Sequence, residues 1–163
     1  MTEAQQEKDK LKNYAFRLLG IRPRSLKEAE AKLSRYAIRK GIPREIILPV
    51  LEELKSAGFL DDKEFTSWWV GQRSEVNPKG MRLILQELKQ KGISQELIES
   101  VISDQSQKPN EQQKAIRILQ KKKWLWQGKN KLETKIKISR ILSSRGFDWD
   151  IINNCIDELL QKD

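Results

Sequence analysis

The chain has 163 residues, of which 37% are hydrophobic and 34% are charged, a ratio that favours thin helical layers over one thick globular core. Its 32 basic and 23 acidic residues give a formal charge of +9 at pH 7, so the expected partner is a polyanion or an acidic protein surface. The single cysteine, Cys155, excludes an intramolecular disulfide, and no run of 18 apolar residues is present that could span a bilayer. These features predict a soluble, cytoplasmic protein without a membrane segment.

The first 60 residues contain three predicted helices. A first helix covers residues 12–21, after an N-terminal segment, residues 1–11, that is expected to fray as chain ends commonly do. Ser25 and Glu28 have the spacing of a capping box, so a second helix is expected to begin there. Gly41 ends this helix, because glycine adopts the left-handed conformation of a helix C-cap without a steric clash.

Two prolines affect the third helix of this group. Pro43 suits a first-turn position, where the N–H that proline lacks has no intrahelical acceptor. Pro49 falls seven positions into the expected helix, where proline removes a backbone donor and clashes with the preceding turn. We therefore expect a kink or a late helix start near this residue.

A second group of helices is predicted in residues 61–104. Its first helix covers residues 61–74, and Pro78 is expected to open the second. Gly92 closes that helix, and Ser94 is the candidate N-cap of the third. Residues 105–111, QSQKPNE, are polar and contain a proline, so they are predicted to be a linker.

The C-terminal group, residues 112–163, has the same order of helices. Its first helix comes from residues 110–127, Gly146 closes the second, and Asp148 is the candidate N-cap of the third. Cys155 falls among apolar positions of this last helix, so we expect a buried, unreactive thiol.

The three groups are repeats of one unit. A triplet of Lys or Arg, Gly and an apolar residue occurs at residues 40–42, 91–93 and 145–147, with the glycines 51 and 54 residues apart. Apolar pairs follow each glycine at the spacing of one helix face, and apolar residues eight and four positions before it form another. The sequence therefore predicts an all-α fold of three tandem three-helix repeats, at residues 12–60, 61–104 and 112–163.

Residues 58–65, Gly-Phe-Leu-Asp-Asp-Lys-Glu-Phe, match the G-x-L-D-D-x-x-F motif of the RecX family. Residues 78–80, 88–93 and 145–147 resemble the family's P-x-G, L-x-x-K-G-[IV] and R-G-F motifs, and the resemblance covers roughly residues 12–162. The chain departs from the family after Phe65, where an alanine usually comes first and this sequence has Thr-Ser-Trp-Trp. The third repeat matches only loosely apart from its glycine.

The resemblance implies an elongated, curved array of three-helix repeats and a cytoplasmic regulator of homologous recombination and DNA repair. Members of the family bind RecA and usually restrain its filament on single-stranded DNA, and so its strand exchange and its coprotease activity in the SOS response. Related arrays are thought to lie in the groove of the RecA filament. The family-motif positions are expected to be structural, and they are Gly58, Leu60, Asp61, Asp62, Phe65, Gly92 and Gly146.

Asp61 and Asp62 are adjacent carboxylates, which also occur in metal and acid–base sites. Their position directly before a helical run favours capping and stabilisation of the helix dipole instead. Adjacent side chains on a helix also diverge, which disfavours joint chelation. Phe59, Leu60 and Phe65 are expected to pack in the core between the first two repeats.

Tryptophans are the second motif with two interpretations. In the pairs Trp68/Trp69 and Trp124/Trp126, neighbouring side chains point in different directions, so at least one member of each pair is expected to be partly exposed. An exposed ring beside basic residues could stack on an unpaired base or fill a partner pocket. Core packing is the favoured role for these residues and for Trp149.

A one-sign charge block is the sharpest binding signal. Residues 114–145 hold eleven Lys or Arg and one acid, Glu133, whereas residues 146–163 hold five acids and one lysine. A solvated helix face usually mixes signs, so this block favours a salt-sensitive surface for a polyanion or an acidic partner. The candidate partner-binding or DNA-binding residues, including a smaller group in the first repeat, are Lys121, Lys122, Lys123, Lys129, Lys131, Lys135, Lys137, Arg140, Arg145, Arg35, Arg39 and Lys40.

The sequence contains no recognisable catalytic motif. The chain has no histidine to act with its one cysteine, and it has no P-loop, nucleophile elbow or zinc-spaced cysteine set, so we expect no catalytic residue, metal or cofactor. The first interpretation is a monomeric regulator of the RecA filament, with direct contact to single-stranded DNA left open. The alternative is a DNA-binding helical protein without sequence specificity that acts without RecA. A scaffold without filament affinity would be favoured if the basic block were paired internally.

Overall fold

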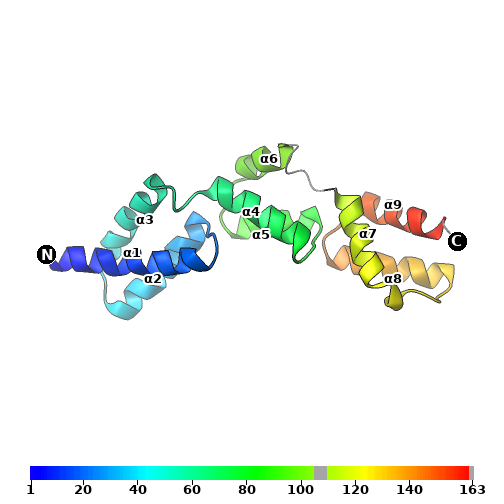
Figure 1. Ribbon diagram of the computed structural model, residues 1–163, viewed down its shortest axis with the longest axis horizontal. Coiled ribbons are helices and arrows are strands. Elements are labelled where there is room, and N and C mark those ends of the chain that lie inside the picture. Colours follow the sequence, from blue (N-terminus) through cyan, green and yellow to red (C-terminus); the bar gives the residue numbers. More distant parts are fainter. Residues whose placement is uncertain (105–109, 162–163) are drawn as a thin grey trace. The chain divides into compact units, whose positions relative to one another are not determined.

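The computed structural model describes residues 1–104 and 110–161, and within these ranges its regular structure is entirely helical (Figure 1). The elements in chain order are α1 (Glu3–Ile21), α2 (Leu26–Lys40), the 3-10 helix η1 (Arg44–Ile46), α3 (Ile47–Ser56), α4 (Asp62–Glu75), α5 (Met81–Gln90), α6 (Gln95–Ser103), α7 (Glu111–Lys121), the 3-10 helix η2 (Lys123–Leu125), α8 (Lys131–Ser144) and α9 (Trp149–Leu160). The chain divides into two compact units. The first comprises residues 1–68 and 89–97, and the second comprises residues 69–88 and the described residues from 98 onward.

α1 corrects the expectation of a frayed N-terminus. The helix begins at Glu3, and the Thr2 side chain accepts a hydrogen bond from the backbone N–H of Gln5, which satisfies a donor that the helix start leaves free. Lys8 also forms an ion pair with Glu53 of α3. Residues 3–11, predicted to fray, are therefore the first half of a longer helix, held by a cap and by contacts with α3.

α2 begins and ends as its sequence predicts. Ser25 and Glu28 form both hydrogen bonds of the capping box, and Gly41 closes the helix in the left-handed conformation at φ 67°.

The late start expected at the third helix is present as well. Residues 44–46 form a single 3-10 turn, and α3 begins only at Ile47, so Pro49 occupies the third α-helical position. At this position a backbone N–H would have no intrahelical acceptor, so the proline costs the helix no hydrogen bond.

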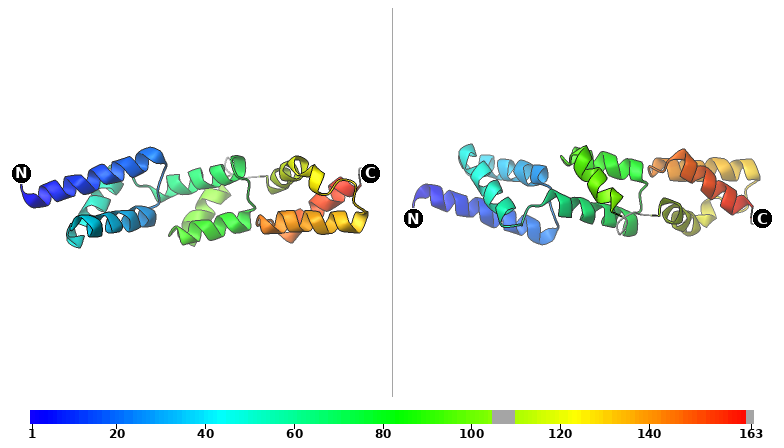
Figure 2. Two further views of the ribbon diagram at one scale, coloured as in Figure 1. Left: turned by 90° about the horizontal axis from the view of Figure 1, so that it is seen from below. Right: turned by 90° about the horizontal axis from the view of Figure 1, so that it is seen from above.

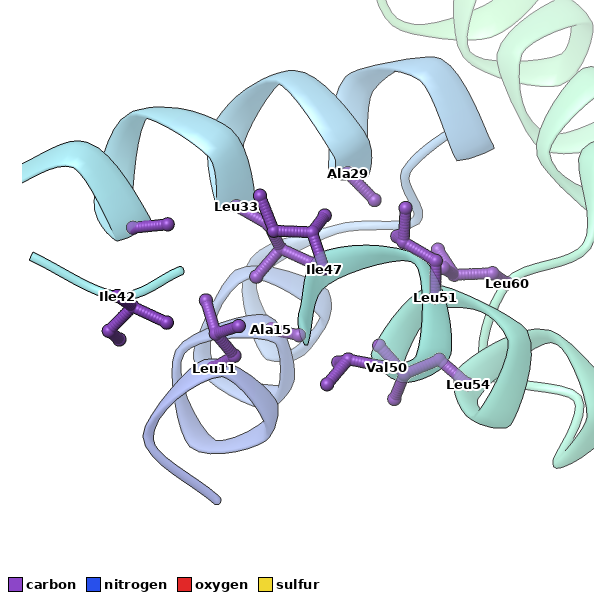
Figure 3. Close-up of a cluster of buried hydrophobic side chains, with 11 residues drawn as sticks. Leu11, Ala15, Ala29, Leu33, Ile42, Ile47, Val50, Leu51, Leu54 and Leu60 are labelled. Atoms are coloured by element: carbon purple, nitrogen blue, oxygen red, sulfur yellow. The ribbon is translucent and has the colours of Figure 1, made fainter. Parts of the chain in front are cut away.

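The core of the first repeat lies between α1, α2 and α3 (Figure 3). Each helix presents apolar residues spaced three or four apart, such as Leu11 and Ala15 of α1 and Ala29 and Leu33 of α2, and these side chains point toward Val50 and its neighbours on α3. Leu60, from the segment after α3, closes one end of this cluster.

The second group of helices differs from expectation at one boundary. Pro78 does not open the second helix, because α5 begins at Met81 and Gly80 occupies the N-cap position. Ser94 caps α6 by accepting a hydrogen bond from the backbone N–H of Leu97. The predicted linker, residues 105–111, lies outside the described residues from 105 to 109, while Asn110 caps α7 and Glu111 begins it.

The C-terminal helices α7, α8 and α9 pack beside one another around a second core (Figures 1 and 2). α7 is shorter than expected: it ends at Lys121, and η2 and a turn at Gly128 follow it, which allow Trp126 to reach back into the core. Asp148 occupies the N-cap position of α9 without a side-chain cap bond. Cys155 is fully buried, and burial, with the nearby Glu158, raises the pKa of its thiol to about 11.

Candidate interaction surfaces

The C-terminal basic surface consists of eight of the candidate cations, which lie on α7, η2 and α8 and on the connectors between them. Six of the expected residues are exposed, and Lys122 and Lys137 are half-buried. None of them forms an ion pair with another described residue. The surface comprises Lys121, Lys122, Lys123, Lys129, Lys131, Lys135, Lys137 and Arg140.

Two basic residues of the same sequence block have other roles. Lys114 is only 1% exposed, where its ammonium pairs with Glu111 at 2.5 Å and lies 5.8 Å from the centre of the Phe147 ring. Arg145, expected to bind a partner, is half-buried and donates to the backbone carbonyl of Pro78 at 3.2 Å. Both side chains therefore hold the second unit together.

The tryptophan pairs divide as expected, with one member of each buried. Trp126 is buried and its indole N–H donates to the Leu119 carbonyl, whereas Trp124 is 74% exposed and follows Lys123 in η2. Trp69 is buried and Trp68 is half-buried near Arg22. Trp149, expected in the core, is 63% exposed at the first position of α9.

A depression of about 710 Å³ adjoins the C-terminal basic surface. Its wall combines three cations of the surface, Lys123, Lys129 and Lys131, with the buried ring of Trp126 and with Leu159. A concave site of this size with an apolar wall and a cationic rim suits part of an anionic ligand.

A second basic surface lies on α1 and α2, and we call it the Tyr14–Tyr36 surface. The two tyrosine rings form a close, nearly parallel stack, with centroids 4.3 Å apart and planes inclined by 12°. The Arg17 guanidinium lies 5.8 Å from the Tyr14 ring centre, and that of Arg39 lies 6.0 Å from Tyr36. The surface comprises Tyr14, Arg17, Lys32, Arg35, Tyr36 and Arg39.

The structure brings two of the three expected N-terminal residues to this surface. Arg35 and Arg39 line an open depression of about 480 Å³ with Tyr14 and Lys32, whereas Lys40 lies at the C-terminus of α2. The sequence interpretation missed the tyrosines and Lys32. A signal was present, because each tyrosine precedes an arginine by three residues on its helix, the spacing that places both on one face.

The family-motif residues shape the backbone, fill the core or cap a helix. Gly58 has φ 81°, and Leu60 and Phe65 are buried. The Asp61 carboxylate caps α4 by accepting from the backbone N–H groups of Lys63 and Glu64.

Asp62 and Phe59 complete the motif in different ways. The Asp62 carboxylate accepts from the backbone N–H of Leu26, the first residue of α2, at 2.8 Å, so it joins α4 to the first repeat. Phe59 is 53% exposed and meets the edge of Phe16, which corrects its expected place in the core.

Glu28 is the centre of a charged network within the first unit. Its carboxylate accepts from the guanidinium of Arg22 at 2.7 Å and from the ammonium of Lys91 at 2.5 Å. Burial alone would raise the pKa of Glu28, but these bonds and the backbone N–H of Ser25 outweigh it and hold the pKa at about 2.

Glu87 has the matching role within the second unit. Its carboxylate accepts from the indole N–H of Trp69 and the guanidinium of Arg73, both at 2.9 Å, and from the ammonium of Lys79. Burial raises its pKa, but the three donors together lower it below the ordinary glutamate value. Both networks pair charges internally, whereas the cations of the two basic surfaces form no ion pair within the part of the chain that the structure describes.

The described residues offer neither a metal-ligand cluster nor a membrane-spanning helix. Among residues 1–104 and 110–161, no three His, Cys, Asp or Glu side chains gather as a metal-ligand set. None of the helices in those ranges combines the length and the apolarity that crossing a bilayer requires.

The fold and these surfaces define a basic tandem helical-repeat protein with two cationic surfaces. Models of the RecX family match the chain twice, the second three-helix domain at residues 61–102 and the third at residues 110–156. The chain is 33% identical over 147 residues to a regulatory protein RecX of Chlorobium phaeobacteroides, covering 90% of this chain and 91% of that one. It is also 32% identical over 143 residues to one of Pelodictyon phaeoclathratiforme, covering 88% and 84%. The chain belongs to the RecX family.

Solved structures agree with this assignment. The crystal structure of RecX from Lactobacillus salivarius has a TM-score of 0.76 to this chain at 25% identity, over 95% of this chain and 97% of that chain. A second crystal structure, of a regulatory protein RecX, has a TM-score of 0.74 at 20% identity over 93% and 73%, and that likeness concerns the fold. The predicted all-helical tandem repeat is confirmed.

Proposed function

We propose that this protein is a non-catalytic cytoplasmic regulator that binds the RecA filament on single-stranded DNA and restrains RecA activity in recombination and repair. Its membership of the RecX family supports the choice of partner. The two basic surfaces supply the means of binding, through electrostatic attraction to a nucleoprotein filament and through exposed aromatic and aliphatic side chains.

The observation that carries the proposal is that the cations of the C-terminal basic surface form no ion pair with any residue the structure describes. Lys131 and Lys135 are one helical turn apart on α8, and like charges at that spacing destabilise a helix. Lys121, Lys122 and Lys123 add three adjacent positive charges without an ion pair to any described residue. An anionic partner would remove this repulsion, so the arrangement favours binding over a purely structural scaffold.

Direct binding to DNA without RecA is the second candidate function. The Tyr14–Tyr36 surface favours it, because stacked aromatic rings flanked by arginines suit the bases and phosphates of a single strand. The two functions differ in whether RecA increases the affinity of the protein for a DNA strand. A filament regulator gains affinity from RecA itself, whereas a DNA binder gains none.

Fluorescence anisotropy separates the two functions. Binding of the protein to RecA filaments on labelled single-stranded DNA is compared with binding to the naked strand across a salt series. We expect much tighter binding to the filament. Equal affinity for both, with a steep dependence on salt, would overturn the proposal and leave the DNA-binding function.

A charge-reversal pair of variants locates the surface. The variant K121E/K123E/K131E/K135E is expected to lose affinity and to reduce the slope of log K against log salt by about 0.7 for each phosphate contact that is lost. The control K10E/K55E/K63E/K89E changes the net charge equally at four exposed lysines outside both surfaces. An equal loss of affinity in the two variants would show that net charge, and not the C-terminal basic surface, determines binding.

A further inference from the structure

We propose that a second copy of this chain docks head to tail, the C-terminus of α2 in one copy binding the N-terminus of α8 in the other. The proposal rests on a junction that occurs twice inside the chain. In each case the C-terminus of one repeat's second helix docks on the N-terminus of the preceding repeat's second helix. It does not depend on the proposed function.

The first junction joins residues 89–92, at the C-terminal end of α5, to α2 within the first unit. The Ser25 hydroxyl, at the N-cap of α2, donates to the backbone carbonyl of Lys91 at 2.8 Å. The Lys91 ammonium returns to Glu28, the third residue of α2, at 2.5 Å. Gly92, at φ 80°, lies against the side chain of Lys27, and a Cβ there would lie 2.7 Å from a carbon of that lysine.

The second junction joins α8 to α5 within the second unit. The N–H of Gly80, at the N-cap position of α5, donates to the backbone carbonyl of Arg145 at 2.7 Å. The Arg145 guanidinium returns to the Pro78 carbonyl, again at the start of the preceding second helix. Gly146, at φ 85°, lies against Leu83.

The two junctions share one arrangement. A basic residue accepts a hydrogen bond at its carbonyl from the N-cap position and returns its side chain to the same helix start. The glycine after it packs on a first-turn side chain, which needs the absence of a Cβ. In both junctions the second residue of the receiving helix also donates to a carbonyl in the last turns of the docking helix, Lys27 to Gln90 at 3.3 Å and Arg82 to Ser143 at 3.1 Å.

The corresponding docking element of the first repeat is Lys40–Gly41 of α2. Gly41 has φ 67°, close to that of Gly92 and Gly146, yet a Cβ added there would meet nothing within 4 Å. Lys40 is exposed and forms no ion pair with a described residue, and Ile38 in the same turn is 64% exposed. This element has the form of a junction whose partner is missing among residues 1–104 and 110–161.

The corresponding receiving element of the third repeat is the N-terminus of α8. Asn130 is the N-cap, and its Oδ1 accepts from the backbone N–H of Glu133 at 2.8 Å, which leaves its amide N–H groups to donate. Glu133 is the third residue of α8, the position of Glu28 in α2, and is the single acid among residues 114–145. Leu132, second in the helix as Lys27 is in α2, is 68% exposed.

Placing these elements together reproduces the first junction between copies. The Asn130 amide donates to the Lys40 carbonyl as Ser25 does to Lys91, and the Lys40 ammonium pairs with Glu133. Leu132 covers Gly41, as Lys27 covers Gly92. The contact is small and lacks a covalent link, so it is expected to be weak in solution and to strengthen where copies are held at high local concentration.

A charge swap tests the pairing of Lys40 with Glu133 by sedimentation velocity at high protein concentration. We expect the wild type to show a sedimentation coefficient that rises with concentration, and K40E and E133K each to remain monomeric. Mixed in equal amounts, the two variants are expected to associate again, because each copy then supplies the opposite charge to its neighbour. A wild type that stays monomeric, or a mixture that does not recover, overturns the proposal.

Matched controls distinguish this contact from a general effect of charge. K55E and E30K change exposed residues of the first repeat by the same charges and should associate as the wild type does. In a C155S background, oxidised mixtures of K40C and L132C chains should give cross-linked heterodimers, whereas K40C with S144C, at the other end of α8, should not. Equal cross-linking in both mixtures would also overturn the proposal. None of these measurements includes RecA or DNA, so their failure leaves the proposed function standing.

Discussion

The backbone N–H of Gly80 donates to the backbone carbonyl of Arg145 at 2.7 Å, which joins the start of α5 directly to the end of α8. This approach is possible because Gly80 has no side chain: a Cβ at that position would clash with the backbone of Gly146 and Phe147. The proline-x-glycine motif at residues 78–80 is therefore a packing requirement as well as a helix start. Glycine at position 80 permits the two main chains to touch, whereas any larger residue would push them apart.

Replacement of this glycine should weaken the second unit. G80A forces two backbone segments apart, so we expect a loss of about 1–3 kcal/mol in the free energy of unfolding, measured by urea denaturation. G71A is the matched control, because Gly71 lies within α4 with open space around it, and there the change should be neutral or stabilising by up to about 1 kcal/mol. Equal effects from the two substitutions would contradict the close contact at Gly80.

Acid should destabilise the first unit through Glu28. Its pKa is lowered from 4.5 to about 2 in the folded state, so its contribution to stability is fully present above pH 4.5 and is lost as the pH falls from 4.5 toward 2. E28Q removes that contribution, so the variant should be less stable at neutral pH and should lose less stability over this range. Thermal melts between pH 2 and 7 test this. E30Q, at an exposed position of α2, should follow the wild type.

Asp61 should matter as a helix cap. D61A removes the carboxylate that accepts from two backbone N–H groups at the start of α4, so we expect a loss of about 0.5–2 kcal/mol in chemical denaturation. D61S retains an acceptor at the N-cap and should recover most of the stability. A full loss in D61S would contradict the capping role and show a need for the carboxylate itself.

Cys155 should resist modification until the chain unfolds. Its thiol is fully buried with a pKa raised to about 11, so at pH 8 almost no thiolate is present and a disulfide reagent has little access. Reaction followed by absorbance should be slow in buffer and fast in urea. S144C adds an exposed thiol to the same chain and should react at once, which gives an internal reference for the native protein.

Local chemistry made much of the fold predictable. Ser25 and Glu28 form the expected capping box, and Gly41, Gly92 and Gly146 adopt the left-handed conformation, because these features depend on residues within a few positions of one another. The boundaries that were wrong depend on distant contacts. α1 extends back to Glu3 with Lys8 held by Glu53 on another helix, a pairing that no local pattern indicates.

The interaction surfaces divide in the same way. The sequence alone predicted the charge block of residues 114–145, because charge is a property of composition. Tertiary structure decided which of those charges are available: Lys114 is buried against Glu111 and Phe147, and Arg145 belongs to a junction. It also brought Tyr14 onto Tyr36 and aligned the two internal junctions. Helix periods and caps are short-range and can be deduced from spacing, whereas the pairing of helices depends on packing across tens of residues, which only the folded chain reveals.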